Sequence, residues 1–390
     1  SITNFLAEIR KTAASVNPKI AVIPEIWPGI EQSAVSVGAD VYQIYPVVDA
    51  IAHEYEFGSG DDHTAASRGE FDWFMYQVGI TSFRAFAQGK PTWILNYSWD
   101  GNPRVKPSDA MKNLAMSEAI AGANFWDAPG HVMAGSNDLA TRKQIFAWIK
   151  QNQHALYASR TPVGNLGVYF SNSTRNFYPQ FLDHYRGVLL LLLRKHLQFQ
   201  IVTPRTLSSF SGNVLVLPGV RVLSPDEFTS LRAFNAKGGK LVLTGYADPA
   251  LKKLEHAVSI GSSPGVEYLD SAKKNFEGSP PDSQSKFLKI IADSAEYQVQ
   301  ASPDMVAYVA KADGKTHWYF ANFKGLKKGD ATVPDPLKDI IITAPLSVGA
   351  TLHFVPFLGA EESISGTQDR GHVRFVIPEI GRAAIAWTDH

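Results

Sequence analysis

The first 155 residues constrain the fold most, because short apolar runs alternate there with stripes of apolar residues at helical spacing. The runs with the pattern of buried strands are 19–24 (KIAVIP), 40–46 (DVYQIYP), 91–96 (PTWILN) and 123–126. The stripes that predict helices are 2–9, 71–86, 107–120 and 145–149. Strands that alternate with helices form a parallel sheet through right-handed crossovers. We therefore predict half of a (β/α)8 barrel over residues 1–158.

Polar and aromatic residues gather where these predicted strands end. The candidates are Glu25, Trp27, Tyr45, His53, Glu54, Asn96, Trp99, Asp100, Trp126 and Asp127. The carboxyl ends of parallel strands meet at one edge of a sheet, so we expect these side chains to line one cleft. Aromatic rings stack on sugar faces, and carboxylates bind hydroxyls or carry out acid–base chemistry. A single tryptophan at a strand end more often packs in a loop or core than lines a sugar site, but three strand ends that each carry one favour a binding cleft.

The loop after the second predicted strand is acidic and contains two histidines, at residues 53–63. A stretch of this kind is usually a solvated surface, with metal binding as the lesser alternative. We therefore assign no metal site and no cofactor to this chain.

Residues 159–295 predict a flavodoxin-like, doubly wound domain. Its strand patterns are 166–170, 200–203, 213–218 and 240–244. The clearest helix start is Ser224-Pro225-Asp226-Glu227, which combines a capping serine, an early proline and two acids. A stretch rich in Gly, Ser and Pro at 259–285 predicts a loop or linker, and 286–295 predicts a helix.

Residues 296–390 predict a small antiparallel β-sandwich. Segments of period two at 305–311 and 316–322 flank Asp313-Gly314, a dipeptide typical of tight hairpin turns. Similar segments follow at 352–356, 372–377 and 383–387. We expect this domain to be structural rather than glycan-binding.

Composition excludes several classes of function. The chain has no cysteine, so disulfides, thiolate metal sites and cysteine nucleophiles are ruled out. Lys+Arg and Asp+Glu both number 37, a balance that argues against a nucleic-acid partner. The longest apolar block, 188–193, is far below the roughly 20 residues that cross a bilayer. We expect no membrane partner and no secretory leader, and both a cytoplasmic and an exported location stay open.

The middle of the chain resembles the trimerisation domain of family 42 β-galactosidases. The resemblance is carried by residues 163–178, centred on 168–173, and by NVLVLPGVRVLSPDEFTSLRAFNAKGGKLVLTG at 213–245. It implies that the first 155 residues correspond to strands five to eight of that family's (β/α)8 barrel. It also implies that the last hundred residues correspond to the family's C-terminal β-sandwich.

The resemblance places the usual catalytic pair in doubt. In that family the acid/base follows barrel strand four, which has no counterpart here, and the nucleophile ends strand seven. The position expected to hold the nucleophilic glutamate carries Asn96, and an amide cannot form the usual glycosyl ester. The middle domain is also related to class I glutamine amidotransferases, whose cysteine is replaced here by Thr244-Gly245-Tyr246.

Three functional hypotheses follow. The first is a glycoside hydrolase, β-galactoside-like, whose re-sited carboxylates are drawn from Glu25, Glu54, Asp100 and Asp127. Glu25 is the preferred acid because it lies among apolar neighbours, and Asp100 or Asp127 would be its partner. The second is a non-catalytic carbohydrate-binding or scaffold protein that has lost the nucleophile. The third is an esterase-type hydrolase that uses a set drawn from Ser98, His53, His131 and Asp127.

A half-barrel raises the question of what covers its open sheet edges. Parallel sheets with apolar faces are normally covered on both sides, and open edges invite pairing. We therefore predict a homo-oligomer, a dimer or a trimer, with a fragment of a longer hydrolase as the alternative. In either case we expect a carbohydrate substrate, held by Trp27, Tyr45, Asn96, Trp99 and Trp126.

Overall fold

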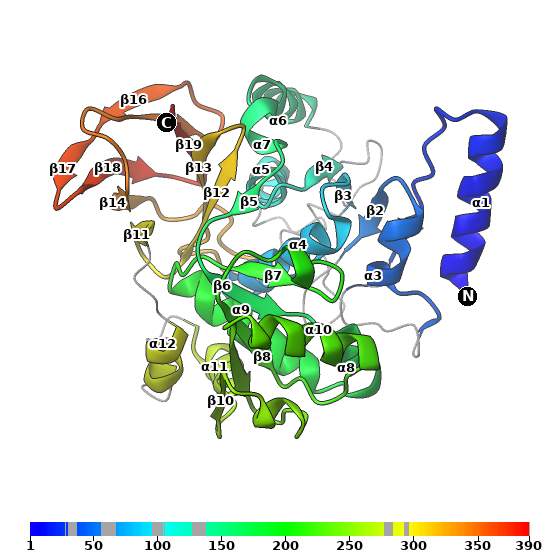
Figure 1. The fold of residues 1–390 in the computed structure, drawn as a ribbon. Helices are drawn as coiled ribbons and strands as arrows, with labels where there is room; N and C mark the ends of the chain where they lie inside the picture. The colour runs from blue at the N-terminus through cyan, green and yellow to red at the C-terminus, as the bar shows by residue number, and fades with distance from the viewer. Residues whose placement is uncertain are drawn as a thin grey trace. The chain divides into compact units, whose positions relative to one another are not determined.

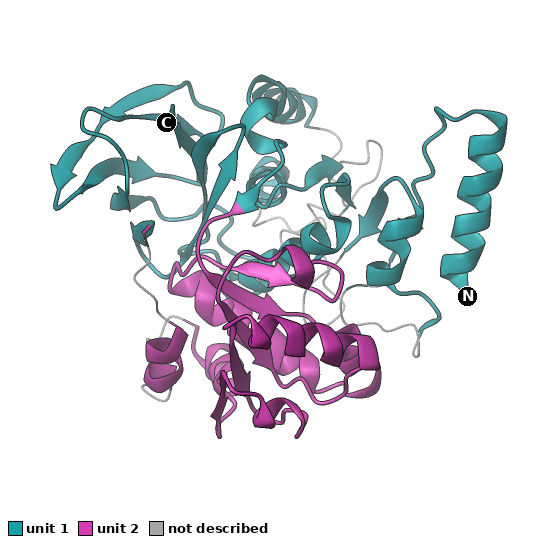
Figure 2. Cartoon of the chain, in the orientation of Figure 1, with its two compact units in different colours: residues 1–32, 37–161, 297–390 teal, residues 33–36, 162–296 magenta. Residues whose placement is uncertain are grey.

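The computed structural model describes residues 1–27, 29, 37–55, 68–95, 104, 106–126, 138–276, 284–291 and 296–389. The chain divides into two compact units (Figure 2). Unit 1 combines residues 1–32, 37–161 and 297–390, and unit 2 combines 33–36 and 162–296. The sheets predicted for the half-barrel and for the β-sandwich thus both lie in unit 1.

Unit 1 contains a four-stranded parallel sheet of order β1-β2-β3-β4 (Figure 1). Its strands are β1 (Glu25–Ile26), β2 (Ile51–Glu54), β3 (Thr92–Leu95) and β4 (Asn124–Trp126). Its helices are α1 (Ile2–Val16), α3 (Val41–Ile44), η1 (Tyr45–Val47), α4 (Glu70–Ala87), α5 (Pro107–Ile120), α6 (Leu139–Gln151) and α7 (Gln153–Leu156). This arrangement confirms the predicted partial barrel.

The prediction of a strand at 40–46 is wrong, because this segment forms the helical turns α3 and η1. Asp40 caps the first turn, and its carboxylate accepts the backbone N–H of Tyr42 at 3.0 Å. Val41, Tyr42 and Ile44 are all buried, which does not match the alternation of buried and exposed residues in a half-buried strand. The strand that pairs beside β1 begins at Ile51, and the first strand begins at Glu25 rather than within 19–24.

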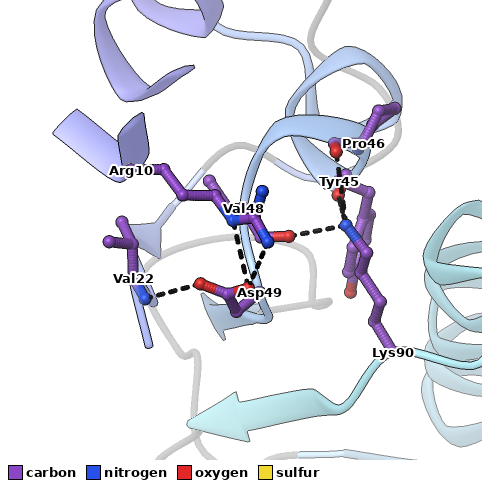
Figure 3. A network of polar contacts seen from close by, with 7 residues as sticks. All are labelled: Arg10, Val22, Tyr45, Pro46, Val48, Asp49 and Lys90. Atoms are coloured by element: carbon purple, nitrogen blue, oxygen red, sulfur yellow. Dashed lines mark hydrogen bonds and ion pairs between the residues drawn. The ribbon is translucent and has the colours of Figure 1, made fainter. Parts of the chain in front are cut away.

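A polar network holds the segments that precede the strands of this sheet (Figure 3). The carboxylate of Asp49 accepts Arg10 Nη2 at 2.8 Å and the backbone N–H of Val22 at 2.9 Å. The ammonium of Lys90 donates to the carbonyls of Tyr45 and Val48, both at 2.6 Å. These bonds join α1, the segment before β1 and the turn before β3 to residues 45–49, which precede β2. The network therefore lies at the amino-terminal ends of the strands, opposite their carboxyl ends.

The antiparallel part of unit 1 consists of two sheets. One has the order β11-β14-β18-β17 and the other β16-β15-β19-β13-β12-β5. The strands are β5 (Thr161–Pro162), β11 (Gln298–Gln300), β12 (Met305–Ala312), β13 (Lys315–Asn322), β14 (Leu337–Ala344), β15 (Thr351–Pro356), β16 (Glu362–Ser365), β17 (Thr367–Asp369), β18 (His372–Ile380) and β19 (Ala383–Thr388). Asp313 and Gly314 have φ of 49° and 76°, as the hairpin turn between β12 and β13 requires.

The β-sandwich is bonded directly to the outer helices of the half-barrel. Tyr308 Oη donates to Gln77 Oε1 on α4 at 2.8 Å, and Arg382 Nη2 lies 2.6 Å from Asp109 Oδ1 on α5. The rings of Trp73 and Phe323 stack with centroids 5.7 Å apart. These buried contacts explain why the two parts form one compact unit although residues 162–296 separate them in sequence.

Unit 2 is built on a five-stranded parallel sheet of order β10-β9-β8-β6-β7. The strands are β6 (Leu166–Tyr169), β7 (Gln200–Val202), β8 (Val214–Pro218), β9 (Lys240–Thr244) and β10 (Ala257–Ile260). The helices are α8 (Asn172–Phe177), α9 (Phe181–Arg194), η4 (Leu207–Ser209), α10 (Pro225–Ala236), η5 (Leu251–Lys253), α11 (Pro264–Lys274) and α12 (Ser285–Ile291). At the predicted start of α10, the Ser224 and Glu227 side chains form a reciprocal capping box.

The linker predicted at 259–285 is wrong over its first half, where α11 forms. Proline at the first helical position and a buried face of Tyr268, Leu269 and Ala272 stabilise this helix. A Cβ on Gly187 of α9 would lie only 1.8 Å from the carbonyl oxygen of Gly265. The backbones of α9 and α11 are therefore in direct contact, which requires glycine at this point. In the sequence, the same glycine content was interpreted as a loop signal.

Candidate functional site

The register of the parallel sheet in unit 1 sorts its side chains onto two faces. Paired residues of neighbouring parallel strands point to the same side, and residues two apart on a strand share a face. Ala52 pairs with both Glu25 and Trp93, while Leu95 pairs with both Glu54 and Trp126. Glu25, Glu54, Trp93, Asn124 and Trp126 therefore all project from one face of the sheet, which we call the open face.

The opposite face is covered by the outer helices. His53 stacks on Phe83 of α4 with ring centroids 4.0 Å apart, and Phe125 packs against Phe146 of α6 at 5.5 Å. A Cβ on Gly79 of α4 would lie 2.0 Å from Tyr55 Oη, so the helix needs glycine to admit this side chain. The open face is thus the side that a barrel would turn toward its axis.

The open face brings together three of the residues predicted from the sequence, Glu25, Glu54 and Trp126. Glu25 is exposed, Glu54 and Trp126 are half-buried, and Trp27, which follows β1 directly, is 58% exposed. With strands about 4.8 Å apart and about 3.3 Å per residue, the Cα atoms of Glu25 and Glu54 are about 8 Å apart. Carboxyl groups on side chains of this length can reach either separation used by glycoside hydrolases, about 5.5 Å or about 6.5–9.5 Å.

Trp93 is the open-face residue that the sequence analysis missed. It is 38% exposed although it lies in the middle of β3. The signal that would have found it is alternation, since Trp93 and Leu95 share a face and Thr92 and Ile94 share the other. The prediction counted strand ends only and took no account of which side each residue faces.

Tyr45 and His53 lie on the helix side of the sheet, away from Glu25 and Glu54. Tyr45 is 1% exposed, and its hydroxyl lies 2.6 Å from His53 Nε2 and 3.2 Å from Thr92 Oγ1. Burial lowers the pKa of His53 to about 3, so the imidazole is neutral. Its Nε2 is engaged with Tyr45, which leaves this histidine unsuited to act as the base of the esterase-type set.

Several predicted site residues lie outside the described residues. These are Asn96, Ser98, Trp99, Asp100, Asp127 and His131. Among the residues that the structure does describe, no three His, Asp or Glu side chains form a group that could hold a metal ion. In the same part of the chain, no helix has the length and apolar character to cross a membrane.

Unit 2 contains a serine in a local context that the sequence analysis overlooked. Ser263 is the central residue of Gly261-Ser262-Ser263-Pro264-Gly265, which joins β10 to α11 as a nucleophile elbow joins strand and helix. In such an elbow the residue after the serine donates its N–H to the oxyanion, and Pro264 has none. Ser263 also has an ordinary φ of −112° rather than a strained one. This turn therefore lacks both the N–H donor and the strained serine backbone that acyl transfer at a nucleophile elbow uses.

Partial barrel, doubly wound sheet and β-sandwich together define a mixed α/β fold of several parts. Among solved structures, the chain is similar to α-L-fucosidase isoenzyme 2 from Paenibacillus thiaminolyticus, with a TM-score of 0.70 and 12% identity. It is also similar to a β-galactosidase from Bacillus circulans sp. alkalophilus, with a TM-score of 0.64 and 10% identity. The apo exo-carrageenase GH42 from Bacteroides ovatus has a TM-score of 0.59 and 10% identity.

These three structures are longer than the region that this chain matches. The chain aligns over 100%, 99% and 100% of its own length, and spans 71% of the fucosidase, 66% of the β-galactosidase and 55% of the carrageenase. No protein-family profile and no curated protein sequence matches the chain. At identities this low, the likeness establishes the fold and leaves the activity to be argued from the site.

Proposed function

We propose that this protein acts on a carbohydrate as a glycoside hydrolase, with a β-galactoside-like sugar as the first substrate to test. The observation that carries the proposal is the open face, where Glu25 and Glu54 share one side of the sheet with Trp93 and Trp126. Two carboxylic acids on neighbouring strands match the acid and base, or acid and nucleophile, of glycosidic bond cleavage. The indole rings beside them, exposed in Trp93 and half-buried in Trp126, match the apolar face of a pyranose.

In this proposal Glu54 and Glu25 share the catalytic work, and Trp126 and Trp93 hold the sugar ring. Asp100 and Asp127 remain proposed partners, since both follow strands of the same sheet in sequence. Trp27, Trp99 and Asn96 are proposed contacts to the substrate from the same side. Tyr45 is proposed only as a support, because its hydroxyl is used within the protein.

The test is hydrolysis of chromogenic substrates by the purified chain. 4-Nitrophenyl β-galactoside, α-fucoside and α-rhamnoside are compared with 4-nitrophenyl acetate and butyrate. Turnover of a glycoside that is lost in Glu54→Gln or Glu25→Gln, with esters untouched, supports the proposal. Turnover of glycosides that is unchanged in both variants refutes it.

A second candidate is a non-catalytic carbohydrate-binding protein, and Asn96 is the observation that favours it. The asparagine stands where the resemblance expects the nucleophile, and an amide forms no glycosyl ester. This candidate predicts saccharide binding that depends on Trp126 and Trp93 with no turnover of any glycoside. Calorimetric titration with galacto-oligosaccharides, run beside the hydrolysis assay, separates the two functions.

The state of assembly bears on both candidates. β1 and β4 are the outer strands of the parallel sheet, and α1 exposes Ile2 (41%), Phe5 (66%) and Ile9 (38%) at helical spacing. We propose that a second (β/α) layer, supplied by another copy of the chain, covers this stripe and the sheet edge. Sedimentation that shows a monomer at micromolar concentration would refute this part of the proposal.

A further inference from the structure

The doubly wound sheet of unit 2 has a topological switch point at its first strand. The chain passes from β6 to β7 on one side, and β8 lies on the other side of β6. In open parallel sheets of this kind, ligands bind outside the carboxyl ends of the strands, at the point where the strand order reverses. The turns after β6 and β8 are therefore the place in unit 2 to search for a ligand site.

Two tyrosines and one arginine gather at this edge, with Arg221 and Tyr246 exposed and Tyr178 half-buried. Arg221 follows β8, and its Cζ lies 5.2 Å from the ring centroid of Tyr178 and 5.8 Å from that of Tyr246. Tyr246 follows β9 and is 69% exposed, an unusual value for an aromatic residue beside a sheet. Arg221 is exposed and forms no ion pair within the part of the chain that the structure describes. We call these three residues the tyrosine–arginine stack.

The two turns that carry Arg221 and Tyr246 are held in place by their packing on His184. Gly219 and Gly245 have φ of 61° and 63°, and each packs on the imidazole of His184. A Cβ would lie 2.8 Å from His184 Cδ2 at the first glycine and 2.5 Å from Cε1 at the second. The backbone N–H of Gly219 donates to the carbonyl of Thr244 at 3.0 Å, which joins the two turns. Preorganised turns of this kind present side chains at low entropic cost.

We propose that the tyrosine–arginine stack binds an anionic saccharide, a sugar ring that carries a carboxylate or a sulfate. The guanidinium of Arg221 has no ion pair within the described residues, so it can donate two parallel hydrogen bonds to an oxyanion. The exposed ring of Tyr246 offers the apolar surface that a pyranose covers. A nucleotide fits less well, because the loop after β6 (SNSTRN, 171–176) contains no glycine to cradle a phosphate. This site shares no residue with the open face and does not depend on the proposed hydrolysis there.

The experiment is calorimetric titration of the whole chain with three oligosaccharides of equal length. One is an oligogalacturonide, one is a sulfated galactan fragment and one is a neutral galactan fragment. We expect binding of at least one anionic ligand that weakens about tenfold in Arg221→Gln, as loss of a charged hydrogen bond predicts. Tyr246→Ala should weaken the same ligand by a similar factor, and binding should fall as salt is raised. Arg232→Gln, which removes an exposed arginine on α10, is the matched control and should change nothing.

The outcomes distinguish this site from the open face. All titrations are repeated in the Glu25→Gln/Glu54→Gln double variant, where binding that depends on Arg221 should persist. The relative affinity for the uronate and the sulfate identifies which anion the site prefers. Equal binding of neutral and anionic ligands, no binding of either anionic ligand, or full affinity in Arg221→Gln would overturn the proposal, whatever the result of the hydrolysis assay.

Discussion

Glu54 and Trp126 both pair with Leu95, one from each side, so that the carboxylate and the indole project from the same face of the parallel sheet. Leu95 itself is 6% exposed. A sugar ring placed over this leucine would contact the carboxylate on one side and the indole on the other.

Replacement of Glu54 by Gln should lower glycoside turnover by about 10²- to 10⁴-fold, the usual worth of one general acid or base. The amide keeps the size of the side chain and removes its proton chemistry. Initial rates on the best chromogenic glycoside measure the effect. The control is Glu8→Gln on α1, an exposed glutamate that should leave the rate unchanged.

Replacement of Trp126 by Ala should weaken saccharide binding about tenfold, or about 1.4 kcal/mol, with a smaller loss for Trp93→Ala. The substitution removes apolar surface that the sugar would cover, and Trp93 on β3 can replace only part of it. Titration of the inactive Glu54→Gln variant measures binding without turnover. Unaltered affinity in both tryptophan variants would show that the sugar binds elsewhere.

Replacement of Arg382 by Met should lower the free energy of unfolding of unit 1 by about 3 kcal/mol. The guanidinium bonds to Asp109 Oδ1 at 2.6 Å and to the carbonyl of Thr332 at 3.0 Å, and only 14% of its side chain is exposed. Its loss leaves a largely buried carboxylate unpaired. Urea denaturation gives the value, and Lys338→Met serves as control, because its exposed pair with Glu379 should contribute less than about 1 kcal/mol.

The charge on His353 should make the β-sandwich less stable as pH rises through neutrality. Hydrogen bonds to Asp389 and to Glu361, at 2.9 and 2.8 Å, raise the pKa of this imidazole above its usual value near 6.5. A pKa raised by folding contributes stability that is complete below the unfolded pKa and is lost as pH passes the folded pKa. Wild type should therefore exceed His353→Gln in stability at pH 5.5, and the two should converge by pH 9. A difference that grows with pH would contradict this assignment.

Replacement of Gly79 by Ala should destabilise unit 1 by about 1–3 kcal/mol, because the new methyl group overlaps the ring of Tyr55. The same substitution in an exposed helix position normally stabilises. The double variant with Tyr55→Leu should recover part of the loss, since the smaller side chain makes room. Thermal unfolding followed by circular dichroism would measure both variants.

The sequence predicted the parts of the fold whose signal is local. Pro107–Ile120 was delimited by its proline and its apolar spacing, and the hairpin at Asp313-Gly314 by its turn chemistry. The segment 40–46 was misjudged because the prediction considered only its run of apolar residues. It took no account of Asp40, which caps the helical turn. α11 was misjudged because the glycine, serine and proline content of 259–285 was taken as a loop signal, although Pro264 begins the helix and Tyr268 and Leu269 lie on its buried face.

The candidate site was predictable to a similar extent. Trp126 was predicted at the end of its strand, where β4 has it. Glu54 was assigned to the loop after a strand at 40–46 but ends β2, and Glu25 was predicted to follow a strand but begins β1. Trp93 was not predicted, because its exposure depends on which face of β3 it occupies, and that is fixed by pairing with Ala52 and Asn124. The tyrosine–arginine stack joins three residues from separate turns, so only the folded sheet reveals it.

Unit 1 is discontinuous, with its half-barrel near one end of the chain and its β-sandwich at the other. On the ribosome, α4 and α5 emerge long before the strands that carry Tyr308 and Arg382. Their apolar and polar partners are missing during that interval, while all of unit 2 is already available to fold by itself. The contacts that join the two parts of unit 1 can therefore form only after all of unit 2 has been synthesised.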